Sequence, residues 1–254
     1  MNVYQCLTYE TVRMAIGPAF GLMMRMRSEG NENVPAQGGA LIVANHRNPL
    51  LEPMSIAYKV ERPVNFVAAS VAFKLPVVNR VVRALGGIPV DVFGGRQSQD
   101  DLNNAVQMLR DGELVCVFPE GVHTIAHLHT VAKIRNFRTG FSRIALRAQV
   151  PVIPVAVIGM GERNLPTVPP ALVKPFFDHP EFQDGVKWTY YKRVRVRIGK
   201  PIDLSGYYDQ ELTKELIDRV SGKVRRIIIK LYDGEDLDRF LTGETPFDIF
   251  TDRV

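Results

Sequence analysis

The sequence predicts an α/β fold, a single domain with a mostly parallel mixed sheet flanked by helices. Short apolar runs rich in β-branched residues recur along the chain and alternate with segments of helical periodicity. This alternation is typical of a sheet whose neighbouring strands run parallel. The chain has 254 residues, 46% of them hydrophobic and 23% charged, which is enough to bury a substantial core in one domain.

Six stretches have the composition of strands. Five are short apolar runs, at residues 40–44, 64–68, 88–92, 114–118 and 152–158. The sixth, at 190–198, alternates, with Arg193, Arg195 and Arg197 on one side and apolar residues on the other. The alternation predicts a half-buried strand whose arginines face water.

Two helices are marked by their periodicity. One is expected after Ser98 and Asp101, which resemble a capping box, and Gly112 is placed to close it. The other spans residues 212–231, where apolar residues recur at three- and four-residue steps and basic residues occupy the opposite side. We expect this amphipathic helix to cover one face of the sheet.

The first 29 residues are predicted to form a membrane-facing helical segment, ahead of a domain at 30–254. The apolar stretch 14–24 is shorter than the ~20 residues that a membrane-spanning helix needs. Arg13, Arg25 and Arg27 flank it, which suits an interfacial helix lying in the headgroup layer. A helix packed on the protein is the alternative.

Net charge and cysteine content bear on the possible binding partners and on the cellular compartment. The formal charge of +5 favours an anionic partner, which leaves nucleic acid, an anionic membrane and a phosphorylated substrate open. The two cysteines, Cys6 and Cys116, show no spacing typical of a disulfide framework. A reducing, cytoplasmic environment is the simpler interpretation.

A polar cluster directly follows the first apolar run and contains Asn45, His46 and Glu52. Ligands of α/β proteins usually bind at the ends of such strands. A neutral imidazole accepts a proton from a hydroxyl group when a carboxylate holds its other ring nitrogen. His46 and Glu52 are therefore candidates for a general base and its partner.

A second polar cluster follows the run at 114–118. It reads Phe118-Pro119-Glu120-Gly121-Val122-His123 and brings another carboxylate to the expected edge of the same sheet. Gly121 permits close approach of the backbone to a ligand.

Several blocks together resemble the glycerolipid acyltransferases that include the lysophosphatidic acid acyltransferases. The main blocks are Asn45-His46, Phe118-Pro119-Glu120-Gly121 and residues 150–155, in that family's order. Weaker similarity extends the resemblance over roughly residues 30–202, through the blocks at 30–35, 86–91, 137–140 and 196–201.

The resemblance implies that His46 deprotonates an acceptor hydroxyl, which attacks a thioester directly, with Glu52 orienting the imidazole. It implies acyl-coenzyme A or acyl carrier protein as co-substrate, no further cofactor and no metal. A glycerol-phosphate or lysophospholipid is the expected acceptor, and the cytoplasmic face of a membrane the expected peripheral location.

Three positions depart from the family pattern. The family has Asp where this chain has Leu51, and Glu52 follows one position later. His123 replaces the family's usual Arg, and the nearest candidate for a further phosphate-binding Arg is Arg96. Arg138 matches a basic residue of the family. By the resemblance, the substrate-binding residues are Asn45, Arg96, Glu120, Gly121, His123 and Arg138.

Other functions are weighed on their own residues. His123, His127 and His129 would suit zinc with Glu120, but a polar loop is the favoured interpretation. A serine hydrolase is disfavoured because Gly140-Phe141-Ser142-Arg143-Ile144 lacks the final glycine of its motif. Thioester hydrolysis by His46 remains open as a side reaction. A non-catalytic lipid-binding protein is the main alternative, and nucleic-acid binding ranks last because no motif for it is present.

Overall fold

The computed structural model describes residues 3–48, 50–70, 73, 79–80, 82–83, 86–90, 97–121, 134–175, 183–185 and 189–235. The strands are β1 (Arg27–Glu29), β2 (Ala40–Ala44), β3 (Val64–Ala69), β4 (Ile88–Val90), β5 (Leu114–Val117), β6 (Val152–Asn164) and β7 (Thr189–Ile198). The helices are α1 (Val3–Met23), α2 (Leu51–Lys59), α4 (Gln97–Arg110), α6 (Gly140–Ala148), α7 (Pro170–Val173) and α8 (Lys214–Asp233). Single 3₁₀ turns occur at Asn31–Asn33 and Ser205–Tyr207.

One seven-stranded sheet organises the described chain, in the order β1-β7-β6-β2-β5-β3-β4. The five strands from β6 to β4 run parallel to one another, whereas β7 is antiparallel to β6. β1 lies outside β7 and parallel to it. The predicted α/β class with a mostly parallel mixed sheet is confirmed.

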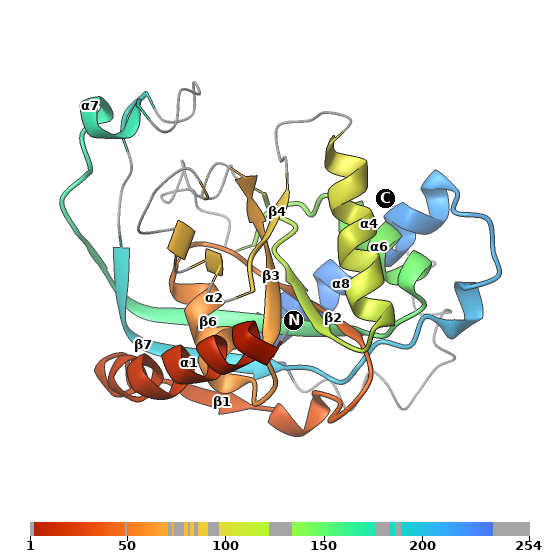
Figure 1. Cartoon of the computed structure of the whole chain (residues 1–254), viewed down its shortest axis with the longest axis horizontal. Coiled ribbons are helices and arrows are strands. Elements are labelled where there is room, and N and C mark those ends of the chain that lie inside the picture. The colour runs from red at the N-terminus through yellow and green to blue at the C-terminus, as the bar shows by residue number, and fades with distance from the viewer. Residues whose placement is uncertain are drawn as a thin grey trace.

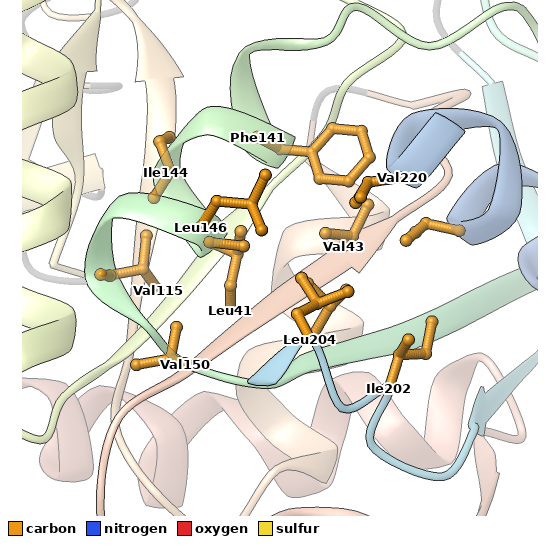
Figure 2. Close-up of a cluster of buried hydrophobic side chains, with 14 of the residues drawn as sticks. Leu41, Val43, Val115, Phe141, Ile144, Leu146, Val150, Ile202, Leu204 and Val220 are labelled. Carbon is orange, nitrogen blue, oxygen red and sulfur yellow. The ribbon is translucent and has the colours of Figure 1, made fainter. Parts of the chain in front are cut away.

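Helices cover both faces of the sheet (Figure 1). On one face α4, α6 and α8 enclose a core that includes Leu41, Val115 and Phe141. Figure 2 shows side chains of α6 and α8 converging there on residues of β2 and β5. On the other face α1 and α2 pack through Tyr9 and Ile56 on the opposite sides of the same strands. Strands buried on both faces explain why the central runs are continuously apolar.

The predicted elements differ from the observed ones mainly at their ends. β6 continues past the predicted residue 158 to Asn164, and the short helix α7 lies in a segment with several prolines that follows it. β1 was not predicted, because three residues with a polar sequence carry too little pattern. It places residues 27–29, the end of the segment expected to be helical, inside the sheet.

None of the helices in the described ranges is long and apolar enough to cross a membrane. α1 contains Pro18 and carries many of the exposed large apolar side chains of the described chain.

Candidate active site

Two polar loops meet at the edge of the sheet where the parallel strands end. β2 and β5 are neighbours, so the residues that follow Ala44 and Val117 emerge side by side. Glu120 joins the loops directly, since its Oε1 accepts the backbone N–H of His46 at 2.8 Å. The expectation that both polar clusters lie at one sheet edge is therefore met.

His46 and Glu52 form a close, buried pair. His46 Nδ1 lies 3.7 Å from Glu52 Oε2, and the residues are 9% and 1% exposed. The imidazole stacks on the ring of Phe118, with centroids 4.3 Å apart. Nδ1 has no hydrogen-bond partner among the described residues, so a small approach of Glu52 would complete the pair.

Asn48 and Tyr191 donate hydrogen bonds to the carboxylate of Glu52. Its Oε2 accepts the backbone N–H of Asn48 at 2.5 Å, and its Oε1 accepts the hydroxyl of Tyr191 at 3.2 Å. Gly159 leaves space for the tyrosine, because a Cβ there would lie 2.5 Å from the Tyr191 ring. Glu52 also stands in the first turn of α2, where the helix dipole favours a negative charge.

Burial shifts the pKa values of His46 and Glu52 so that the neutral form of each side chain is favoured. Loss of water lowers the pKa of His46 to about 4, and it raises the pKa of Glu52 to about 8. The hydrogen bonds from Asn48 and Tyr191 oppose the rise in the pKa of Glu52 because they stabilise its carboxylate. The imidazole is thus neutral near pH 7, the form that accepts a proton.

The charge of Glu52 decides which nitrogen of His46 is free. A protonated Glu52 would donate its proton to Nδ1 and leave hydrogen on Nε2, so Nε2 could not act as a base. An ionised Glu52 instead accepts a hydrogen from Nδ1 and frees the lone pair of Nε2. We therefore expect the active form to require ionised Glu52.

The family model of the Acyltransferase family matches residues 25–158, more than half of the chain and including both polar loops. The chain belongs to this acyltransferase family.

Two relatives show how far the similarity extends along the chain. An uncharacterized protein of Mycobacterium tuberculosis is 28% identical over 85% of this chain and 64% of its own length. The chain thus spans less than two thirds of that relative. A 1-acyl-sn-glycerol-3-phosphate acyltransferase of Borreliella burgdorferi is 26% identical over 79% of this chain and 72% of its own.

A solved structure shares the fold. The crystal structure of the 1-acyl-sn-glycerophosphate (LPA) acyltransferase PlsC from Thermotoga maritima superposes with a TM-score of 0.56. The match covers 88% of this chain and 79% of the other, at 24% sequence identity.

In this acyltransferase-family site, Asn45 and Glu120 position the loops. Asn45 is fully buried, and its amide exchanges two hydrogen bonds of 2.9 and 2.7 Å with the backbone of Val157 in β6. Glu120 uses its second oxygen to accept the backbone N–H of Arg135 at 2.8 Å. The structure thus shows both residues bonded to backbone groups that position the loops, and their expected contact with substrate stays a prediction.

Among the residues predicted to bind phosphate, Arg138 is the one that lies within the described part of the chain. It is exposed, and its side chain lies over Gly121, where an added Cβ would be 3.1 Å from Arg138 Nε. Gly121 has a φ of +74°, a left-handed conformation that suits glycine. The expected roles of Arg96 and His123, and the alternative zinc cluster with His127 and His129, lie outside the described residues. Within the described ranges, no group of three or more acidic, His or Cys residues is arranged to hold a metal.

Sequence reasoning missed three residues of this site. Asn48 donates to the Thr189 carbonyl and accepts the backbone N–H groups of Leu50 and Leu51, which fixes the start of α2. Its position in a polar run before a helix was an available signal for such a turn. Tyr191 and the stacking role of Phe118 had no local signal, because both depend on contacts between distant strands.

Proposed function

We propose that the protein transfers a fatty acyl group from an acyl thioester to a hydroxyl of glycerol 3-phosphate or a lysophospholipid. The observation that carries this proposal is the buried His46–Glu52 pair at the strand ends, within a chain of the acyltransferase family. The names of the Borreliella and Thermotoga relatives support a 1-acyl-glycerol phosphate as the acceptor.

The proposed reaction needs one base and no covalent intermediate on the protein. Nε2 of His46 takes the proton of the acceptor hydroxyl as its oxygen attacks the thioester carbonyl carbon. The C–S bond then breaks, and the leaving thiolate receives that proton from His46. Glu52 pairs with the transient imidazolium through Nδ1, so the positive charge is not left alone in a buried site.

Arg138 is proposed to bind the acceptor phosphate. Its guanidinium is exposed on the loop that Glu120 ties to His46, and guanidinium groups bind phosphate oxygens in pairs. The donor is proposed to be acyl-coenzyme A or acyl carrier protein, and no other cofactor enters the proposed steps.

The proposed location is peripheral, on the cytoplasmic face of a membrane. α1 carries exposed large apolar side chains, which are Val3, Leu7, Met14, Ile16, Leu22 and Met23. Exposed Arg25 and Arg27 follow it, which suits contact with anionic lipid. Both cysteines are unpaired, which agrees with a reducing compartment.

Thiol release from palmitoyl-coenzyme A tests the proposed activity. Purified parent, His46→Ala and His46→Asn are assayed with glycerol 3-phosphate, with lysophosphatidic acid and without acceptor. We expect release that depends on an acceptor and falls by at least about 100-fold in both variants, as loss of a general base gives about 10²–10⁴-fold. Thermal unfolding verifies that the variants are folded.

The other outcomes discriminate between the alternatives. Release without acceptor that disappears in both variants would indicate a thioesterase that uses the same base. No release by the parent with either coenzyme A or acyl carrier protein as carrier, together with vesicle binding unaffected by His46→Ala, would favour the lipid-binding protein.

A further inference from the structure

The far ends of β6 and β7 form an arm beyond the catalytic edge of the sheet. Its described residues are 162–175, 183–185 and 189, and it begins after Gly161, whose φ is +67°. Figure 1 shows β6 and β7 continuing past the end of β2 and carrying α7 away from the body of the protein. The arm therefore projects from the side of the molecule that contains His46.

Apolar and basic side chains are exposed together on this arm. Leu172 in α7 is 65% exposed, and Leu165 is 46% exposed. Arg163 and Lys174 are exposed beside them, and Lys192 is exposed at the base of the arm. The negative charges of the described arm are Glu162, which pairs with Arg47, and Asp184.

The arm is fixed to the catalytic loop at its base. Arg47 is next to His46, and its Nη2 lies 3.4 Å from Glu162 Oε2. Asn48 Nδ2 donates a hydrogen bond to the Thr189 carbonyl at 2.8 Å. Leu50, in the same loop, is 38% exposed. A surface that binds the arm consequently lies next to the loop that contains His46.

We propose that the β6–β7 arm is a second membrane contact, which inserts Leu165 and Leu172 into an anionic bilayer. The membrane contact itself does not depend on the proposed function. Only the purpose of the arm, which is to supply a lipid acceptor to His46, rests on it. Large exposed leucines gain by leaving water for acyl chains, while Arg163 and Lys174 stay at the anionic headgroups. An acidic carrier protein would match the basic residues but leave the leucines without a comparable partner.

Vesicle sedimentation tests the arm directly. The parent is compared with Leu165→Glu/Leu172→Glu, using phosphatidylcholine vesicles with and without phosphatidylglycerol. The matched control is Ala36→Glu/Gln37→Glu, which adds the same charge at two exposed positions before β2, at the other end of the sheet. We expect about tenfold weaker binding of the arm variant to anionic vesicles, and parental binding by the control.

Activity assays separate the arm from the catalytic proposal. If the parent is an acyltransferase, the arm variant should lose transfer to lysophosphatidic acid in vesicles but keep transfer to glycerol 3-phosphate in water. If the parent transfers nothing, the sedimentation result still decides the role of the arm. The proposal would be overturned if the arm variant bound vesicles as well as the parent does. If the arm variant lost only its binding to acyl carrier protein, the arm would be assigned to the carrier protein instead.

Discussion

Replacement of Tyr191 by Phe tests whether Glu52 must be ionised for activity. The change removes one hydroxyl, which donates to Glu52 Oε1 at 3.2 Å, and keeps the ring that fills the space beside Gly159. Tyr191 is only 3% exposed, so water cannot easily replace the lost donor. The carboxylate form of Glu52 is therefore destabilised, and its pKa rises further above about 8.

The size of the effect follows from the lost bond. A buried hydrogen bond to a charged group contributes roughly 1.5–3 kcal/mol, which corresponds to about one to two pKa units at 1.36 kcal/mol per unit. Since the active tautomer of His46 requires ionised Glu52, the acid limb of the kcat profile should move to higher pH by the same amount. Near neutral pH, kcat should fall about tenfold or more, and it should recover as the pH rises.

The assay is kcat against pH for the parent, Tyr191→Phe and the control Tyr190→Phe, whose side chain is exposed on the neighbouring position. The parental rate should increase with pH up to about 8, and the control should follow the same curve. An unchanged acid limb in Tyr191→Phe would refute the link between Tyr191, Glu52 and the tautomer of His46. A uniform loss at every pH would indicate a structural role only.

Three further substitutions have defined expectations. Glu52→Gln should abolish most activity yet resist heat better than the parent at pH 8. The raised pKa of Glu52 contributes stability that is fully present below pH 4.5 and is lost as the pH rises to about 8. Melting temperatures of both proteins at pH 5 and 8 measure this loss of stability. Gly121→Ala should raise KM for glycerol 3-phosphate about tenfold and leave KM for the thioester unchanged, since it strains a positive φ and crowds Arg138. Asn45→Ala should lower the free energy of unfolding in urea by about 2–4 kcal/mol, because buried backbone groups of Val157 lose both partners; a change below about 1 kcal/mol would contradict this account.

The fold was largely predictable because its strands are buried on both faces. Such strands appear as isolated apolar runs, and the predicted runs at 40–44, 64–68 and 114–118 became β2, β3 and β5 with ends displaced by one residue at most. The three-residue β1 was missed, since its place in the sheet is determined by pairing with β7 and by Glu29 contacts to Arg195 and Arg197. Those arginines were expected only to face water.

The candidate site was predictable where its residues are close in sequence. His46 and Glu52 follow the same apolar run, so the sequence could name them as a candidate pair once the second polar cluster supported it. Tyr191 was hidden because strict alternation would place it on the side of Arg193, whereas the structure buries it. The strand changes face where Lys192 and Arg193 are both exposed, opposite the positive-φ Gly161. The contact between Tyr191 and Gly159 of β6 is therefore not visible in the sequence of β7 alone.

The two outer strands of the sheet also affect how copies of this protein meet. β1 and β4 are both only three residues long; β1 has a charged residue at each end, and β4 has Pro89 at its centre. Short, charged or proline-containing borders offer few free backbone groups to the strand of another molecule. Crowding many copies onto one surface should therefore not lead them to join their sheets into aggregates.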